Sequence, residues 1–330
     1  MIRCIIFSRD RAMQLDAVLK SLFLHCLDVD NADICILYKT TNKQHEKQYQ
    51  ELTEEYSGRV FFKQQQNFRQ DVLSYLNPFE KNKFRGFVFW LLCALGRIGP
   101  ALGSSFNRIW RRTVTPVLVF LSTLLLTAIQ KDCFVLFLVD DNLFVQDFHF
   151  KDAIDVLNQT EKLLGFSLRL GENTTYRYSR GQKQSLPNFK NINDNILDFD
   201  WTKSDGDFGY PLEVSSSIYR VSDILPLLMG FPFDNPNVVE ERMAFHARFF
   251  RNERPQLACY QRSVTFCNPV NLVQSVTPNR AGENIKYDID KLSFMFEQDE
   301  RVKVESYSGF IPQSCHQEVE LVFEKLGDDV

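Results

Sequence analysis

The sequence has no large excess of charge of either sign. Its 330 residues include 38 Lys and Arg against 42 Asp and Glu, a net charge of −4. Nucleic-acid-binding proteins usually present a concentrated basic face, so we expect no nucleic-acid partner. With 44% hydrophobic residues the chain can bury a large core, as one large α/β domain or as two smaller domains.

The sequence also lacks closely paired cysteines and a leader-like beginning. Its eight cysteines form no CxxC pair, and Cys4, Cys35 and Cys133 lie in apolar runs where a thiol behaves as a small hydrophobe. We therefore expect reduced thiols and a cytoplasmic protein. The first apolar run is interrupted by charged residues at 9–11, too early for a signal peptide, so no export is indicated.

An alternation of strands and helices opens the chain. Apolar runs at 2–7, 33–38 and 59–63 predict three strands, and a polar helix is predicted at about 43–56. The run 133–139 predicts a fourth strand, buried on both faces. Such βαβα units indicate a mostly parallel, doubly wound sheet, in which the turns after the first, second and fourth strands line one edge.

The most informative residues are Asp140, Asp141 and Asn142, which follow the fourth predicted strand. Open α/β sheets bind ligands beyond the carboxyl ends of their strands. Two adjacent carboxylates repel each other, and a divalent cation or a set of ribose hydroxyls is the usual partner that makes the pair tolerable. Asp and Asn are also common turn residues, so strand-end acids that only cap a turn are the alternative.

Together with two other segments, these residues resemble a known family of enzymes. The segments 5–11, 64–73 and 137–142 follow the order of nucleotide-binding elements in nucleotide-sugar glycosyltransferases of the glycosyltransferase-A fold, and are similar to family-2-like members. Asp140-Asp141-Asn142 stands where such enzymes have a DxD-type motif. The resemblance covers roughly the first 80 residues and residues 130–250.

The resemblance implies a nucleoside site formed by Ser8, Arg9, Asp10 and Arg69, with Asp140 toward the ribose. Ordinary solvation at the surface is the alternative for the two arginines, because most charged side chains face solvent.

The resemblance further implies a divalent cation, Mn²⁺ or Mg²⁺, that bridges the two phosphates of a nucleoside diphosphate sugar. Asp141 would be its principal ligand. Asn142 departs from the pattern, because an amide offers a hard cation only a neutral oxygen. His246 or His316 would complete the shell, although a lone histidine is more often structural. Arg280 would stabilise the departing diphosphate.

The second half of the chain has features of an acceptor site. Trp201 and the aromatic, glycine-rich loop 205–211 would form a wall for a sugar ring, or would plug the core. The cap-like Asn235-Pro236-Asn237 predicts the start of a helix that carries Glu240 and Glu241.

The two glutamates stand where the resemblance places the catalytic base of inverting transferases, which takes the proton of the acceptor hydroxyl. Glu240 is the first choice, Glu241 the second and Asp207 the third. Acids in a first helical turn also complement the helix dipole, which is the alternative for whichever glutamate points away from the cleft.

Two apolar stretches, 86–95 and 114–129, interrupt the alternation. Each is short of the roughly 20 apolar residues that a spanning helix needs. Residues 81–113 favour an in-plane membrane anchor or a partner-binding hairpin, whereas 120–129 favours a buried helix before the Asp140 strand. The basic and tryptophan residues of the segment are Lys81, Lys83, Arg85, Trp90, Arg97, Arg108, Trp110, Arg111 and Arg112.

We therefore predict a single α/β domain of glycosyltransferase-A type, with a Rossmann-like sheet, made by residues 1–80 and 130–330. Residues 1–142 would be mainly nucleotide-binding and 143–330 mainly acceptor-facing, with the helical segment 81–129 inserted.

The predicted function is inverting, metal-dependent transfer of a sugar from a nucleoside diphosphate to a glycan or lipid-linked acceptor, as in polysaccharide biosynthesis, on the inner face of a membrane. Two alternatives stay open. A nucleotidyltransferase also uses a parallel sheet and acidic site, but the sequence has no GxGxxG or GxxxxGKS loop. A non-catalytic membrane-associated binding protein would explain Asn142 as a degraded metal ligand.

Overall fold

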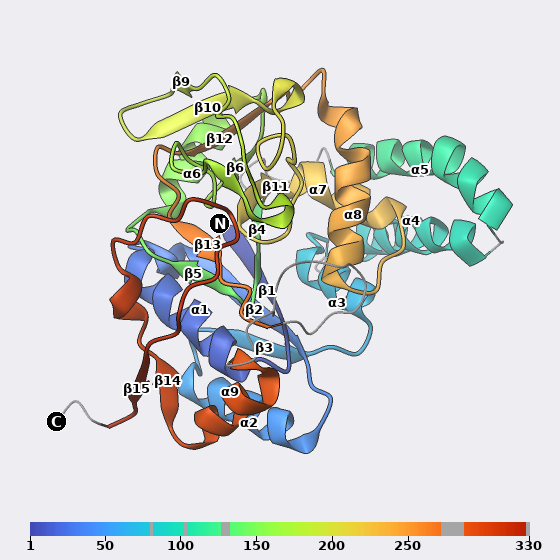
Figure 1. Cartoon of the computed structure of the whole chain (residues 1–330). Coiled ribbons are helices and arrows are strands. Elements are labelled where there is room, and N and C mark those ends of the chain that lie inside the picture. The colour runs from blue at the N-terminus through green and yellow to red at the C-terminus, as the bar shows by residue number, and fades with distance from the viewer. Residues whose placement is uncertain (80–81, 102–103, 127–132, 272–286, 328–330) are drawn as a thin grey trace.

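The computed structural model describes residues 1–79, 82–101, 104–126, 133–271 and 287–327, which Figure 1 draws as ribbon. Within these ranges, nine strands form one sheet in the order β3-β2-β1-β4-β11-β6-β12-β10-β9. The strands are β1 (Ile2–Arg9), β2 (Ala32–Lys39), β3 (Phe61–Gln64), β4 (Phe134–Val139), β6 (Leu163–Ser167), β9 (Lys190–Asn191), β10 (Ile196–Asp200), β11 (Ser217–Arg220) and β12 (Gln256–Tyr260). Shorter pairs join β5 (Asn142–Phe144) to β13 (Thr265–Cys267), β7 (Tyr176–Arg177) to β8 (Gln182–Lys183) and β14 (Glu300–Val302) to β15 (Phe323–Lys325).

The α/β class predicted from the sequence is confirmed, and the four predicted N-terminal strands are β1, β2, β3 and β4. They pair in parallel, with Ile6 of β1 opposite Ile36 of β2 and Leu138 of β4. The second half of the sheet is mixed, because β11 runs antiparallel to both β4 and β6. The simple alternation did not indicate this reversal, since β11 follows a long loop rather than a crossover helix.

Helices cover both faces of the sheet (Figure 1). They are α1 (Ala12–His25), α2 (Lys43–Glu55), α3 (Phe68–Leu76), α4 (Lys83–Ala101), α5 (Ser104–Leu126), α6 (Phe150–Gln159), α7 (Val221–Gly230), α8 (Pro236–His246) and α9 (Ile289–Glu297). Alternate residues of each strand enter opposite cores. Cys4 and Ile6 of β1 pack with α1, whereas Ile5 and Phe7 pack with α3 and α7.

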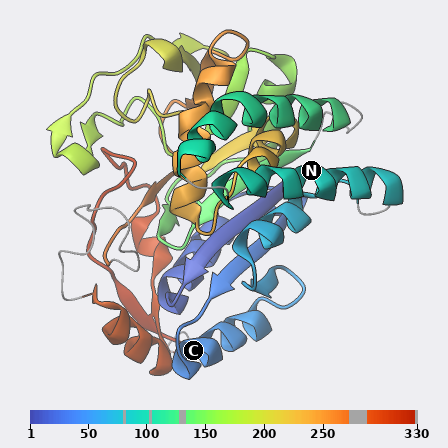
Figure 2. The ribbon, with the colours of Figure 1, turned by 90° about the vertical axis from the view of Figure 1, so that its right-hand side faces the viewer.

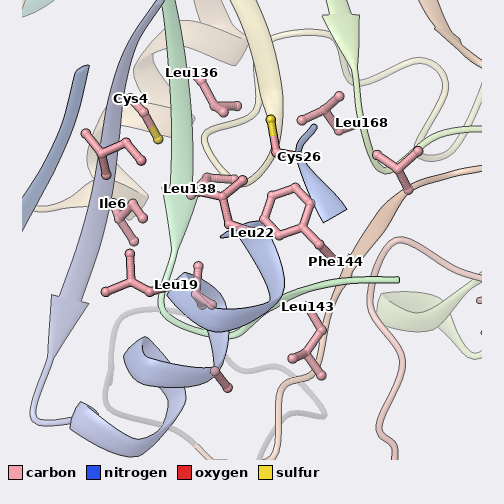
Figure 3. Close-up of a cluster of buried hydrophobic side chains, with 14 of the residues drawn as sticks. Cys4, Ile6, Leu19, Leu22, Cys26, Leu136, Leu138, Leu143, Phe144 and Leu168 are labelled. Atoms are coloured by element: carbon pink, nitrogen blue, oxygen red, sulfur yellow. The ribbon is translucent and has the colours of Figure 1, made fainter. Parts of the chain in front are cut away.

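The first of these cores is an apolar layer between the sheet and α1. Figure 3 shows Leu136 and Leu138 of β4 beside Leu19 and Leu22 of α1, all fully buried. A buried leucine contributes about 1.5–3 kcal/mol to folding. This layer holds the carboxyl ends of β1 and β4 at a constant spacing, which places the polar turns that follow them side by side.

The predicted inserted segment folds as α4 and α5, which lie between α3 and β4 in the chain. The two helices run side by side and project away from the sheet (Figures 1 and 2). None of the described helices has the length and apolar character needed to cross a bilayer. All eight cysteines are free thiols, and seven of them are buried.

Candidate functional site

The turns after β1 and β4 meet at Asp140, which is 4% exposed. Its Oδ2 atom accepts hydrogen bonds from the hydroxyl of Ser8 at 2.9 Å and the backbone N–H of Arg9 at 3.0 Å. Its Oδ1 atom accepts a hydrogen bond from Nη1 of Arg11 at 2.8 Å. Tyr49 of α2 completes the cluster through hydrogen bonds with Ser8 and the N–H of Arg11. Asp140 therefore ties the first turn to the fourth strand.

The residues around the ends of β1 and β4, namely Ser8, Arg9, Asp10, Arg11, Asp140 and Asp141, are called the strand-end site. Arg11 is its buried cation, although the sequence analysis assigned it no role. Burial opposes its charge, but Asp140 and Asp141 outweigh that effect and raise the pKa of Arg11. Its second terminal nitrogen donates to the backbone carbonyl of Asn271. Arg11 thus holds the segment at 268–271 against the two aspartates.

Asp10 has a backbone conformation that only a few residue types adopt readily. Its φ angle of 56° lies in the left-handed region, where Asp and Asn are tolerated better than bulky residues. Its carboxylate accepts the N–H of Thr41 at 2.7 Å, so it joins the turn after β1 to the turn after β2. The adjacent side chain of Arg9 is 49% exposed and lies 3.6 Å from Asp10, at the edge of the site.

Asp141 presents an oxygen atom that the protein leaves available. Its Oδ1 atom is buried and meets no N–H or O–H donor among the described residues, with only the weaker thiol donor of Cys267 close by. Its Oδ2 atom lies 3.7 Å from Nη1 of Arg11. Burial raises the pKa of Asp141, Arg11 lowers it and Asp140 raises it again. Such a group suits a ligand that brings positive charge or a donor.

Asn142 faces inward, away from the predicted metal shell. Its Oδ1 atom accepts the N–H of Val139 at 2.9 Å, and its Nδ2 atom donates to Sγ of Cys267 at 3.5 Å. The amide closes the turn between β4 and β5, which an Asp could not do with both a donor and an acceptor. The prediction that Asn142 ligates a metal is therefore corrected.

A second group of charges, the Arg169 cluster, comprises Arg169, Glu213, Ser215 and Glu240. Arg169 follows β6 and donates from Nη1 to the hydroxyl of Ser215 at 2.6 Å, and its Nη2 atom lies 3.7 Å from Glu213. Burial opposes the charge of Arg169, but Glu213 and Glu240 contribute to raising its pKa well above the ordinary value. Glu213 accepts the hydroxyl of Ser215 at 2.6 Å.

Glu240 and Glu241 differ in environment, as adjacent helical residues must. Asn235 caps α8 by accepting the N–H of Val238 at 3.0 Å, and this sets the rotation of the helix. Glu241 is exposed, whereas Glu240 is partly buried beside Arg169. Burial raises the pKa of Glu240, Arg169 lowers it and Tyr210 lowers it further through a hydrogen bond.

Cys267 lies between the two groups of charges. Burial raises the pKa of its thiol, Asp141 raises it further, Arg169 lowers it and Glu213 raises it. Its backbone N–H donates to the carbonyl of Cys315 at 2.9 Å. The Cys315 thiol in turn donates to the carbonyl of Arg169 at 3.7 Å, so the strand-end site and the Arg169 cluster belong to one region of the molecule.

Asp207 approaches the same region from the loop before β11. It exchanges hydrogen bonds with the side-chain amide of Gln184, and its charge raises the pKa of the Cys315 thiol in addition to burial. Within the predicted aromatic wall, Trp201 and Phe208 are buried in the core, whereas Tyr210 is 37% exposed beside Glu240. Phe208 therefore fills the core, whereas Asp207 and Tyr210 lie beside the charged groups of the site.

The two predicted histidine ligands lie in different surroundings. His246, at the end of α8, donates a hydrogen bond from Nδ1 to the carbonyl of Arg242, and its ring stacks on Phe231. Burial, together with repulsion from Arg169, lowers the pKa of His316 to about 3. Among the described residues, no three His, Cys, Asp or Glu side chains gather as a metal site, so Asp141, His246 and His316 do not form one.

A divalent ion nevertheless fits Asp141, whose Oδ1 atom is buried without an N–H or O–H partner among the described residues. Mg²⁺ is commonly held by one or two carboxylates together with substrate phosphates, rather than by a cage made only of protein. The donor set therefore suits an ion whose shell the phosphates of a substrate complete, with Asp141 as its protein ligand.

Arg69 does not reach the predicted nucleoside site. Its guanidinium donates to three carbonyls at the end of α7, those of Phe231 at 3.0 Å, Met229 at 2.8 Å and Leu228 at 3.3 Å. Burial lowers its pKa to about 10. Arg69 caps α7, which corrects the prediction. Arg280, the predicted diphosphate contact, lies outside the described residues.

Sequence reasoning missed Arg11, Tyr49, Arg169 and Glu213. A signal was present for Arg169, because it follows an apolar run at 163–168 as Asp140 follows 133–139. No local signal marked Tyr49, which reaches the site only because α2 packs across the sheet edge.

No model of a protein family matches the sequence. The bifunctional glycosyltransferase pgtA of Dictyostelium discoideum is 24% identical over 243 residues, which cover 69% of this chain and 25% of that protein. The chain thus spans about a quarter of the length of this relative. S. aureus TarS 1–349 is similar in structure with a TM-score of 0.43 and 10% identity, over 82% of this chain and 61% of TarS. Its UDP complex gives a TM-score of 0.39 and 14% identity, over 78% of this chain and 60% of TarS.

Proposed function

We propose that this chain transfers a sugar from a nucleoside diphosphate sugar to the hydroxyl of a glycan or lipid-linked acceptor, with inversion at the anomeric carbon. The observation that carries the proposal is the placement of an available carboxylate, Asp141, in the same region as the partly buried Glu240. The sequence similarity to a glycosyltransferase, which covers 69% of the chain, supports the same reaction class.

In this proposal Glu240 removes the proton of the acceptor hydroxyl as that oxygen attacks the anomeric carbon. The new glycosidic bond forms while the bond from the anomeric carbon to the β-phosphate oxygen breaks, and the nucleoside diphosphate departs with the electron pair. Arg169 stabilises the ionised form of Glu240, because it lowers the pKa that burial raises. Tyr210 donates to the same carboxylate and orients it.

The donor would lie at the strand-end site. Asp141 would hold the divalent ion, which when bound neutralises charge on the departing diphosphate. Arg9 is exposed at the edge of the turn and is available to the donor, whereas Asp140 and Arg11 keep the two turns in place. The contact of Arg280 with the diphosphate stays a prediction.

A hollow of about 340 Å³ lies on the acceptor side and is lined by Tyr176, Tyr178, Gln317 and His316, among others. Aromatic rings with amide groups are the usual surroundings of a bound sugar ring. His316 connects this hollow to Arg169, because, in addition to burial, the charge of Arg169 lowers the pKa of His316. We propose the hollow as the entrance for a sugar of the acceptor.

The alternative of a non-catalytic binding protein loses its main support. It rested on Asn142 as a degraded metal ligand, whereas the amide closes the turn between β4 and β5. An Asn at this position is therefore a structural choice and says little about catalysis.

The proposal is tested by hydrolysis and transfer assays with UDP-, GDP- and dTDP-linked sugars, with Mn²⁺ and after chelation. A CMP-linked sugar is the control, since it lacks the second phosphate. We expect thermal stabilisation and slow hydrolysis with one of the diphosphate donors in the presence of Mn²⁺. Absence of both effects with every diphosphate sugar would contradict the proposed reaction.

A further inference from the structure

The helical arm, defined as α4 and α5, exposes a row of large apolar side chains on each helix. Phe84 is 75% exposed and Phe120 is 62% exposed, far more than a side chain in a core. The exposed residues recur at the three- and four-residue spacing that places them on one side of a helix. They are Phe84, Phe87 and Leu91 on α4, and Val117, Phe120, Leu121 and Leu124 on α5.

The opposite side of the arm is anchored to the body. Phe89 and Cys93 of α4 and Leu118 of α5 are buried in the core that contains α7. A Cβ atom added at Gly96 would lie 2.1 Å from the carbonyl oxygen of Met229, so α4 approaches the end of α7 at backbone contact. The apolar rows are thus the faces left over after the arm has packed, and the helices project from the body (Figures 1 and 2).

The charge of the arm identifies what covers these faces. Residues 82–126 contain six Lys and Arg and no Asp or Glu, so all 42 acidic residues lie elsewhere. Lys83 and Arg97 are exposed at the two ends of the described part of α4. Two copies of such an arm would bring like charges together. An anionic lipid surface offers both the opposite charge and an apolar interior.

We propose that the arm lies in the plane of an anionic membrane surface, with its apolar rows in the acyl boundary and its basic residues at the headgroups. A spanning arrangement is not used, because no described helix is long and apolar enough to cross. Trp90 is 36% exposed and packs edge-on against Phe89, a position suited to the headgroup level. This inference does not depend on the reaction proposed above.

The test uses the full chain and sedimentation with vesicles of phosphatidylcholine, with or without phosphatidylglycerol. The variant Phe84→Ser/Phe87→Ser/Phe120→Ser should bind anionic vesicles about tenfold or more weakly than the native chain, because it removes the inserted side chains. The control Leu27→Ser/Phe61→Ser/Phe294→Ser removes apolar residues outside the arm that are also more than half exposed, and it should bind as the native chain does.

A second variant, Lys83→Glu/Arg97→Glu, should weaken binding to anionic vesicles and reduce its sensitivity to salt. Circular dichroism checks that each variant is folded. Equal binding by the native chain and the Phe84 triple variant would overturn the proposal. The proposal would also be overturned if the native chain bound neither kind of vesicle and was a dimer, while the Phe84 triple variant was a monomer. That result would show that a second copy of the chain covers the arm.

Discussion

The strand-end site and the helical arm depart from ordinary burial in opposite directions. At the site, Asp140 and Arg11 are charged and buried, and each finds its partner within the chain. In the arm, Phe84 and Phe87 are apolar, yet they leave 75% and 67% of their surface exposed. The first departure is explained by folding alone, because pairing offsets the cost of burying charge. The second is typical of an interaction surface, and the membrane contact proposed above would cover it.

Asp141 lies between these two cases, because the residue is only partly buried and its Oδ1 atom has no N–H or O–H partner among the described residues. Asp141→Asn should lower transfer by about 10³-fold or more, because it removes the charge that the donor site needs and leaves the core unchanged. Donor binding in the presence of Mn²⁺ should fall with it. Initial rates and thermal-shift titrations measure both. Asp155→Asn, at a half-exposed aspartate of α6, is the control.

An active Asp141→Asn enzyme would contradict the donor site proposed here. The companion variant Asn142→Asp should not tighten the cation, since the side chain at 142 faces the backbone of β4. We expect it to destabilise the turn instead, because a carboxylate cannot donate to Cys267.

Glu240 and Glu241 form a matched pair that sharpens the comparison within a single helix. Glu240→Gln should lower turnover by about 10²-fold or more with little effect on donor affinity, since general-base catalysis supplies roughly 10²–10⁴-fold. Glu241→Gln should be nearly silent, because that side chain is exposed. Steady-state kinetics separate the two. If both variants had equally small effects on turnover, both glutamates would serve the helix N-terminus alone, and Asp207 would be the next candidate for the base.

Arg11 tests the claim that pairing within the chain stabilises the buried charges. Arg11→Met should destabilise the protein by about 3–5 kcal/mol, since it leaves the buried Asp140 and the partly buried Asp141 without their cation. Urea unfolding measures the loss. Arg9→Met, two residues earlier in the chain but half exposed, should change stability by less than about 0.5 kcal/mol. Similar losses in both variants would show that the strand-end pair contributes little.

The pH dependence of transfer gives the smallest expected effect. Burial raises the pKa of Glu240 above the ordinary 4.5, so the base form is lost as the pH falls through that raised pKa. The acid limb of kcat/KM should therefore lie above pH 4.5. Arg169 lowers this pKa, so Arg169→Gln should move the limb upward by about one pH unit. Arg169→Lys keeps the positive charge, so its acid limb should stay close to that of the native protein. An acid limb that Arg169→Gln also leaves in place would argue against Glu240 as the base.

The N-terminal half of the fold follows from local patterns. Apolar runs predicted the positions of β1, β2, β3 and β4 to within two residues at most of their ends. The signal is clearest for β1 and β4, which are buried on both faces, whereas β3 is short and partly exposed. The cap at Asn235 was equally local and is confirmed by its bond to Val238. The mixed second half of the sheet was beyond such patterns, since the order of β11, β6 and β12 depends on pairings far apart in the chain.

The sequence by itself determined that carboxylates stand at the end of β4 and that a basic, acid-free apolar segment precedes them. Only the tertiary structure decided what each polar group meets. It turned Asn142 toward the backbone, used Arg69 to cap α7 and brought Arg11 and Arg169 beside the acids. The physical reason is that strand periodicity is a local property, whereas the partner of a buried charge is selected by the packing of segments distant in sequence.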